Sequence, residues 1–285
     1  MQRIFVGDIQ GCADELDELL AQAEDRFGQA FELWVVGDLI NRGPDNLRAL
    51  RRVRERVEAS RAHYVLGNHE IGLIATALGV RPLSPFDTYQ DVLDAPDAAD
   101  WLAWIRARPL VVRGELGSQP FVMLHASAHP DWKLDELCER ASAAASHLRM
   151  SDAELAAWLR ETGDADLDLL SRLTRCRGIS ASGLWSSEPP IEGDGSSPWH
   201  TRWAASDPDY GVVYGHWALQ GLHVAPLLRG LDTGCVHHGR GRDGMLTAWL
   251  PDPGCARPFD IPDECFWQIP ARRAYYAHRD TQVGV

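Results

Sequence analysis

The chain has 285 residues, 45% hydrophobic and 24% charged, a composition typical of a globular protein rather than a disordered or fibrous one. Its formal net charge of -13 argues against binding to DNA or to anionic membranes, because both attract cationic surfaces. Lys133 is the only lysine and no Gly-Lys-Ser/Thr run occurs, which excludes a P-loop.

No apolar run approaches the roughly 20 residues of a membrane span, and the apolar segment at residues 4–6 ends too early for a signal peptide. The six cysteines are dispersed without a C-x-x-C pair, a pattern typical of free thiols in a reducing compartment. Two of them, Cys12 and Cys235, are interpreted as small buried thiols, because the sequence identifies no base beside them. We therefore expect a cytoplasmic protein, with its oligomeric state left open.

The first 125 residues alternate short apolar runs with helical patterns. Buried strands are predicted at residues 3–6, 33–36, 63–66, 110–112 and 121–124, and helices at 14–25 and 46–57. In the first helix, Leu16, Leu19 and Leu20 form an apolar stripe, and acidic residues crowd the first turn, where the helix dipole favours them. This alternation predicts an α/β fold.

The second half begins with Ala- and Leu-rich helical patterns at 135–170, with a capping box from Ser151 to Glu154. From 183 to 209 the composition shifts to Gly, Pro, Ser and Trp, which predicts a long surface excursion. Strands are predicted again at 212–214, 228–231, 245–250 and 266–269. We expect one domain over residues 1–285, with a helical and loop insertion at about 135–209.

Three segments share one design, in which a strand ends and a turn of glycine and polar residues follows. They are Gly7-Asp8-Ile9-Gln10-Gly11, Gly37-Asp38-Leu39-Ile40-Asn41-Arg42-Gly43 and Gly67-Asn68-His69-Glu70. Their glycines allow sharp turns beside a ligand. Asp8, Asp38 and Asn68 follow one another at equal intervals, about one strand-helix-strand unit each, so neighbouring strands can aim all three at the carboxyl edge of a sheet.

Two histidines follow later predicted strands: His125 after 121–124 and His216 after 212–214. A single buried histidine is usually a satisfied core group. Together with the three turns, however, the two imidazoles complete a mixed oxygen and nitrogen donor set that suits two borderline divalent cations.

These motifs resemble the calcineurin-like metallophosphoesterases, in particular the branch with the phosphoprotein phosphatases and the symmetrical bis(5'-nucleosyl)-tetraphosphatases. The resemblance runs from about residue 3 to 250 and is most specific in the first 70. Residues 211–217 and 231–235 look like later parts of the tetraphosphatase pattern. The resemblance implies an α/β fold in which two mixed β-sheets pack as a sandwich flanked by helices.

The resemblance also implies a two-metal centre, with Mn²⁺ or Co²⁺ expected and Mg²⁺, Fe or Zn²⁺ left open. The implied metal ligands are Asp8 and Gln10 for the first ion, Asn68, His125 and His216 for the second, and Asp38 as a bridge. It implies that His69 is the general acid or a hydrogen-bond donor, and that Arg42 holds a phosphoryl oxygen. Further expected substrate contacts are Asn41, Arg175 and Arg177, the last two on a basic segment at 174–177.

Two positions depart from the wider family. Gln10 stands where most members carry His, and its amide oxygen is a harder and weaker donor than imidazole. Asn41 stands where phosphoprotein phosphatases carry an Asp that orients the acid histidine, and a neutral amide cannot stabilise imidazolium. A nucleoside diphosphate needs little help to leave, since the last pKa of a phosphate is about 6, so anhydride cleavage is favoured over monoester cleavage.

The predicted activity is therefore metal-dependent, symmetrical hydrolysis of diadenosine tetraphosphate and related dinucleoside polyphosphates to nucleoside diphosphates, through in-line attack on phosphorus by hydroxide between two metal ions. Two alternatives use the same site: a Ser/Thr phosphoprotein phosphatase, or an RNA decapping enzyme with capped 5' ends as substrates. A third is a binding or regulatory module that has lost its first metal through Gln10.

Several other signals are discounted. The run at 239–244 matches G-x-G-x-x-G by letter, but a predicted strand follows it, so a hairpin turn is expected instead of a dinucleotide site. His237 and His238 are interpreted as a solvated loop pair, and the arginines between residues 48 and 56 as a solvated helix face. The tryptophans Trp185, Trp199, Trp203 and Trp217 are expected to pack in the core or in loops rather than against a purine.

Overall fold

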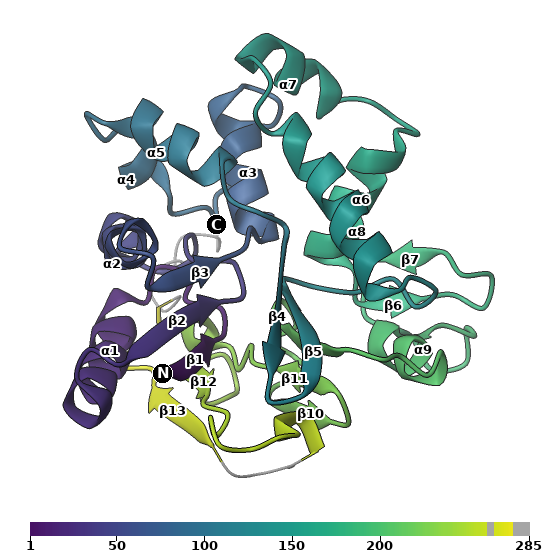
Figure 1. Cartoon of the computed structure of the whole chain (residues 1–285). Coiled ribbons are helices and arrows are strands. Elements are labelled where there is room, and N and C mark those ends of the chain that lie inside the picture. Colours follow the sequence, from purple (N-terminus) through teal and green to yellow (C-terminus); the bar gives the residue numbers. More distant parts are fainter. Residues whose placement is uncertain (261–264, 276–285) are drawn as a thin grey trace.

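The computed structural model describes residues 1–260 and 265–275. Two five-stranded sheets form its centre, and a small sheet lies to one side (Figure 1). The strands of the first sheet, in sheet order, are β13 (Phe266–Pro270), β12 (Met245–Trp249), β1 (Gln2–Val6), β2 (Phe31–Val35) and β3 (Ala62–Tyr64). Those of the second are β10 (His223–Ala225), β11 (Leu228–Gly230), β9 (Gly211–Tyr214), β5 (Gln119–Leu124) and β4 (Val111–Leu116).

Strand direction determines where the ends of the strands meet. In the first sheet β1, β2 and β3 are parallel, whereas β12 is antiparallel to β1. In the second sheet β5 and β9 are parallel, with β4 antiparallel to β5. The carboxyl ends of β1, β2 and β3 therefore lie at one edge of their sheet, and those of β5 and β9 at one edge of theirs.

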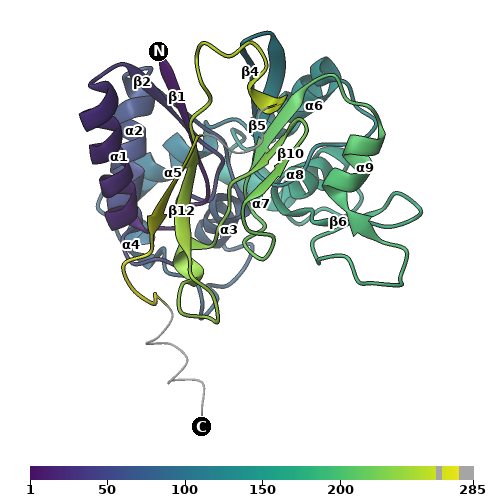
Figure 2. The same ribbon diagram turned by 90° about the horizontal axis from the view of Figure 1, so that it is seen from below.

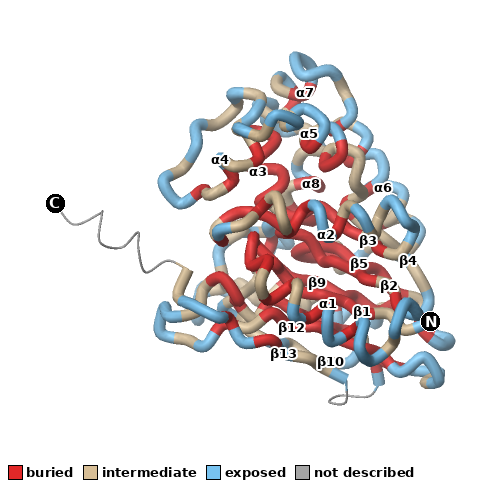
Figure 3. The backbone as a smooth tube through the Cα atoms, turned by 90° about the vertical axis from the view of Figure 1, so that its left-hand side faces the viewer, coloured by how far each residue is buried: buried red, intermediate tan, exposed pale blue. Residues whose placement is uncertain are grey.

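A cluster of buried aromatic rings joins the two sheets. The ring of Phe5 in β1 lies 5.3 Å from Trp34 in β2, 5.4 Å from Phe121 in β5 and 5.3 Å from Trp249 in β12. All four side chains are buried, and the strands that carry them form the buried centre in Figure 3. The two sheets thus pack face to face, which confirms the predicted sandwich.

Helices cover the outside of this sandwich. They are α1 (Ala13–Phe27), α2 (Asn46–Glu58), α3 (Asn68–Ala77), α4 (Gln90–Leu93), α5 (Ala98–Arg106), α6 (Leu134–His147), α7 (Asp152–Trp158), α8 (Ala165–Arg175) and α9 (Trp199–Ala205). The small sheet has the order β7 (Trp185–Ser186), β6 (Gly178–Ile179), β8 (Ser197–Pro198), and two 3₁₀ turns are η1 (Cys235–His237) and η2 (Pro258–Asp260). Figure 2 shows α6, α8 and α9 on the side of the molecule away from α1 and α2.

The first helices form for the reasons that the sequence indicates. In α1 the stripe of Leu16, Leu19 and Leu20 is buried, and the helix is followed by Gly28 with a positive φ of 58°. Asp45 begins α2 by accepting a hydrogen bond from the backbone N–H of Arg48, a common helix cap.

All the predicted strands form within a few residues of their expected bounds, and so do the predicted helices. The capping box of Ser151 and Glu154 begins α7 as expected. The segment 183–209 is less irregular than predicted, since it contributes β7, β8 and α9. That the chain forms a single domain with an insertion stays a prediction.

The prediction of a hairpin turn at 239–244 is wrong. The turn follows η1 and leads into β12, which pairs with β1 and β13 rather than with a strand before the turn. A strand does follow the glycines, so the dinucleotide reading is excluded for the expected reason. Among the described residues, no helix combines the length and hydropathy needed to span a bilayer.

Candidate metal centre

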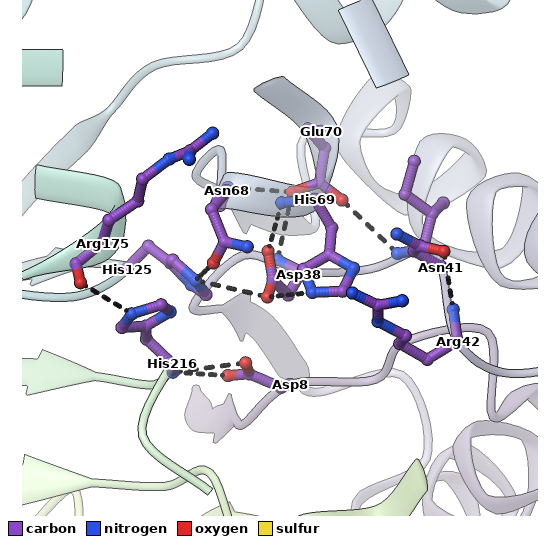
Figure 4. A network of polar contacts seen from close by, with 12 residues as sticks. Asp8, Asp38, Asn41, Arg42, Asn68, His69, Glu70, His125, Arg175 and His216 are labelled. Carbon is purple, nitrogen blue, oxygen red and sulfur yellow. Dashed lines mark hydrogen bonds and ion pairs between the residues drawn. The ribbon is translucent and has the colours of Figure 1, made fainter. Parts of the chain in front are cut away.

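Five polar side chains meet where the parallel strands end (Figure 4). Asp8, Asp38 and Asn68 lie just beyond β1, β2 and β3, and His125 and His216 just beyond β5 and β9. Because the two sheets pack face to face, donors from both meet in one place. The structure therefore brings together the side chains that the turn motifs predict.

Asp38, His125 and His216 form the tightest part of this group. Each offers a ligand atom, and the three atoms lie within 4.8 Å of one another, with all three residues buried. Oδ2 of Asp38 lies 3.4 Å from Nε2 of His125, and the two imidazole rings are 5.1 Å apart. One carboxylate and two imidazoles are ligands that borderline divalent cations accept.

Backbone carbonyls orient the two imidazoles. Nδ1 of His125 lies 2.9 Å from the carbonyl oxygen of Val36, and Nε2 of His216 lies 3.0 Å from that of Arg175. A carbonyl oxygen can only accept, so each of these nitrogens carries the proton and donates. The other nitrogen of each ring is then left with a lone pair, as in histidines that bind metals.

The remaining predicted ligands surround this group. The Asp8 carboxylate is buried and accepts the backbone N–H of His216 at 3.1 and 3.2 Å. Oδ1 of Asn68 lies 3.2 Å from Nε2 of His125. The backbone N–H of Gln10 donates to the carbonyl of Asp38 at 2.8 Å, and Gln10 lines the adjoining cavity.

The electrostatics of the buried acids fit a bound cation. Burial raises the pKa of Asp8 well above its usual range, and repulsion from Asp232 and Asp38 adds to this. Burial also raises the pKa of Asp38, but His125 and His69 outweigh it and hold that pKa below its usual range. Carboxylates this close together need nearby positive charge to stay ionised. The buried acids and the convergent oxygen and nitrogen donors together fit a site for divalent cations.

Glu70 is a site residue that the sequence analysis did not single out. Its carboxylate accepts backbone N–H groups of Asp38 at 3.1 Å, Leu39 at 3.0 Å and Gly67 at 2.8 Å. Burial and repulsion from Asp38 raise its pKa to about 7. Glu70 therefore connects the turn after β2, which carries Asp38, to the turn after β3, which carries Asn68. The signal available was the Gly-x-x-Glu spacing at the start of α3, which is typical of an acid that reaches back to a helix N-terminus.

His69 and Arg42 both face the cavity. Nε2 of His69 lies 3.5 Å from Oδ2 of Asp38, and its buried Nδ1 has no hydrogen-bond partner within residues 1–260 and 265–275. The guanidinium of Arg42 lies 4.0 Å from Asp87 and over the ring of Phe86. Arg42 therefore presents a partly exposed positive charge to the cavity that Asp38 also lines.

Asn41 does not contact His69, although it stands where phosphoprotein phosphatases carry the Asp that orients the acid histidine. Its amide nitrogen donates to Asp87 at 2.9 Å, and its oxygen accepts the backbone N–H groups of Arg42 and Thr88, both at 2.8 Å. No hydrogen bond joins it to His69 in the described part of the chain. Asn41 is also absent from the residues lining the cavity, so the geometry favours a role in holding the turn over direct contact with substrate.

A cavity of about 530 Å³ adjoins the metal centre, within the size range of small-molecule sites. Its lining residues are Gln10, Asp38, Arg42, Asn68, His69, Arg177, Glu188, Pro189, His216, Trp217, Ala218, Leu219, Asp232, His237, Arg240 and Arg242. Four arginines thus face it in a protein of net charge -13. An anionic ligand would meet locally positive charge here despite the overall acidity.

Of the two arginines expected to contact substrate from the basic segment at 174–177, only Arg177 lines the cavity. Its guanidinium donates to the carbonyl of His216 at 3.2 Å. Arg175 is instead the last residue of α8, exposed and outside the lining, and contacts the centre through its backbone carbonyl. Because α8 ends at Arg175, the two side chains lie in different surroundings, and only Arg177 is placed to contact a ligand in the cavity.

The loop after η1 is closer to the site than expected. His237, Arg240 and Arg242 all line the cavity, and Arg242 donates to the carbonyl of Ala218 at 2.6 Å. His237 is thus half-buried at the end of η1 and part of the cavity wall, whereas His238 is half-buried outside the lining. Among the tryptophans, Trp199 and Trp203 are buried as expected, whereas Trp217 lines the cavity.

Comparisons with known proteins agree with this architecture. The family described as calcineurin-like phosphoesterase matches residues 1–280. A relative from Ralstonia nicotianae, named a symmetrical bis(5'-nucleosyl)-tetraphosphatase, is 36% identical over 85% of this chain and 88% of its own length. One from Vibrio cholerae with the same name is 37% identical over 84% and 93%.

Solved structures share the fold. The crystal structure of a candidate diadenosine tetraphosphatase covers 95% of this chain and 93% of its own, with 24% identity and a TM-score of 0.61. A cold-active protein-tyrosine phosphatase from a Shewanella species covers 94% and 80%, with 16% identity and a TM-score of 0.55. The chain belongs to the calcineurin-like phosphoesterases and, within them, to the family of the symmetrical bis(5'-nucleosyl)-tetraphosphatases.

Proposed function

We propose that the protein hydrolyses dinucleoside tetraphosphates symmetrically to two nucleoside diphosphates, with two divalent cations, Mn²⁺ or Co²⁺, as cofactors. The observation that carries the proposal is the convergence of oxygen and nitrogen donors beside a cavity lined by four arginines. The tetraphosphatase name of relatives at 36–37% identity supports this substrate class.

The cations would be held in two groups that share Asp38. Asp8 and Gln10 would bind one ion, and Asn68, His125 and His216 the other. Bound there, divalent cations supply Lewis acidity and neutralise phosphoryl charge. The carbonyls of Val36 and Arg175, which accept from the two imidazoles, and the carboxylate of Glu70, which accepts from the turn, would keep the ligands in place.

The remaining polar groups would act on the substrate. Arg42 lines the same cavity as Asp38 and would hold oxygens of the phosphoryl group under attack, while Arg177 would bind the polyphosphate beside His216. Nε2 of His69, near the Asp38 carboxylate, would donate a hydrogen bond to the reacting phosphate. A nucleoside diphosphate leaves without a strong acid, because a phosphate with its last pKa of about 6 is a stable leaving group.

The test is a chromatographic product assay on diadenosine tetraphosphate with Mn²⁺ or Co²⁺. Formation of ADP alone supports symmetrical cleavage, whereas ATP plus AMP would show asymmetric cleavage and contradict the proposal. Parallel assays with a phosphoserine peptide and with 5'-capped RNA compare the rival substrates. Two bound ions per purified chain would exclude the alternative of a metal-depleted binding module.

A further inference from the structure

A second buried cluster lies behind the turn that carries Gln10. Cys12 follows that turn, Glu15 lies in the first turn of α1, and Cys235 begins η1. The two sulfur atoms and a carboxylate oxygen of Glu15 lie within 4.8 Å of one another. Cys12 and Glu15 are 0% exposed and Cys235 is 1% exposed, so the cluster is shielded from solvent.

The Glu15 carboxylate is only half satisfied. Its Oε1 accepts the backbone N–H of Arg272 at 2.7 Å and the hydroxyl of Tyr275 at 2.5 Å. Its Oε2 is buried and has no hydrogen-bond partner in residues 1–260 and 265–275. A buried carboxylate oxygen without a partner is costly, so such a group usually pairs or binds a metal.

We propose that Cys12, Glu15 and Cys235 form a third metal site, which binds a soft divalent cation such as Zn²⁺. Two sulfur ligands favour Zn²⁺ over Mn²⁺ or Mg²⁺, which prefer oxygen. In a tetrahedral zinc site the ligand atoms lie about 3.5–3.8 Å apart, so these three need only a modest inward shift. The unpartnered Oε2 supplies the oxygen ligand, and a water molecule or the Tyr275 hydroxyl completes the four.

The site joins three separate parts of the chain. Cys12 belongs to the turn that continues from Gln10, and Cys235 directly follows the turn that contains Asp232 and Gly234. Through Glu15, the cluster also contacts the segment at Arg272 and Tyr275. A bound ion would therefore link the turn that contains Gln10 to the turn that contains Asp232, and both of them to the segment at Arg272 and Tyr275. It would stabilise the fold without touching substrate.

The difference in ligand chemistry makes the site testable. The candidate catalytic centre has only oxygen and nitrogen donors, so sulfur in the coordination shell of a metal reports on the cysteine cluster. Full-length protein saturated with Mn²⁺ is incubated with one equivalent of Zn²⁺ and measured by X-ray absorption at the zinc edge. We expect a sulfur shell at about 2.3 Å. A shell of oxygen and nitrogen alone would overturn the proposal, and this measurement on the unmodified chain does not depend on any variant folding.

Variants then assign the sulfur atoms. The double variant C12S/C235S should lose the sulfur shell, and E15Q should weaken Zn²⁺ binding by about tenfold or more. The matched control is C255S/C265S, which removes two cysteines that line a different cavity and should keep the sulfur shell. Sulfur retained in C12S/C235S, or lost in the control, would overturn the assignment. None of these readouts requires hydrolytic activity, so the result stands apart from the proposed function.

Discussion

The amide of Asn41 donates a hydrogen bond of 2.9 Å to Oδ1 of Asp87. Both residues are buried, and the Asn41 oxygen accepts two backbone N–H groups at the same time. The Asn41 amide therefore both donates a hydrogen bond to Asp87 and accepts hydrogen bonds from the backbone. An ionised carboxylate in its place could only accept. Asn41 holds the turn before Arg42 against the segment that carries Asp87 and Phe86.

The first prediction concerns Asn41→Asp. The new carboxylate would face Asp87, so we expect the free energy of unfolding to fall by about 1–3 kcal/mol, the cost of a lost buried hydrogen bond. The ratio of monoester to anhydride hydrolysis should stay unchanged, contrary to what the resemblance to phosphoprotein phosphatases implies, because Asn41 is bonded to Asp87 and not to His69. Urea denaturation and paired kinetic assays check both points. In the double variant N41D/D87N the pair again has one donor and one acceptor, so part of the lost stability should return. An N41D variant as stable as wild type would contradict the proposed role of the Asn41–Asp87 hydrogen bond.

The second prediction concerns Glu70→Gln. The carboxylate accepts backbone N–H groups of the Asp38 turn and of Gly67 with both oxygens, and glutamine keeps only one of them. Each N–H left unpaired costs about 1–3 kcal/mol. We expect a lower melting temperature and a fall in kcat, because Asp38 loses its support. The exposed Glu58, paired with Arg54, provides the control E58Q, which should match wild type in both measurements.

The third prediction concerns Gln10→His. An imidazole is a stronger ligand than an amide oxygen for borderline cations. We expect the variant to bind one of two Mn²⁺ ions more tightly and the other unchanged, because Gln10 adjoins Asp8 and Asp38 but belongs to only one of the two ligand groups. Isothermal titration resolves two dissociation constants. Equal tightening of both would show that Gln10 does not distinguish the two positions.

The candidate site is largely predictable because each donor follows a strand. Parallel pairing of β1, β2 and β3 places Asp8, Asp38 and Asn68 at one sheet edge, so local patterns suffice for these three. Helix α3 escaped prediction because residues 69–75 are buried all round, and such a helix lacks the amphipathic period.

Contacts that depend on tertiary packing lie beyond local patterns. Asp87 reaches Asn41 from a segment without regular periodicity, far along the chain. The loop with Arg240 and Arg242 lines the cavity because its two ends are fixed by η1 and β12, which precede and follow it in the chain. The spacing of residues within these two segments therefore does not predict either contact.

The fourth prediction concerns that loop. Arg240 and Arg242 line the cavity, and a polyphosphate long enough to pass the metal centre would meet them. In R240A/R242A we expect the KM for diadenosine tetraphosphate to rise about tenfold, which corresponds to one lost charge-assisted hydrogen bond of about 1.4 kcal/mol, with kcat little changed. The KM for p-nitrophenyl phosphate should change less, because this small ester does not extend that far. The control is R257A, which removes an exposed arginine paired with Asp260; an equal rise in the control would contradict a specific contact.

The fifth prediction concerns removal of the metal ions. Asp8, Asp38 and Asp232 are all buried around one centre, and repulsion from Asp38 contributes to the raised pKa of both Asp8 and Asp232. Two divalent cations would outweigh the charges of Asp8 and Asp38 and leave the cavity attractive to a polyphosphate. Without them, these carboxylates repel both one another and the substrate. We therefore expect a chelator to abolish hydrolysis and to lower the melting temperature.

Mass action sets the size of the stability effect. Each ion that binds only the folded chain stabilises it by about 2.7 kcal/mol when its free concentration is a hundred times its Kd. Calorimetric scans in EDTA and in a series of Mn²⁺ concentrations should give a melting temperature that rises with metal and recovers when Mn²⁺ is restored. Ca²⁺ serves as a comparison, since it prefers a shell of oxygen ligands and His125 and His216 offer nitrogen. A melting temperature independent of Mn²⁺ would show that the buried acids are not a cation site, because their mutual repulsion would then be relieved by protons alone.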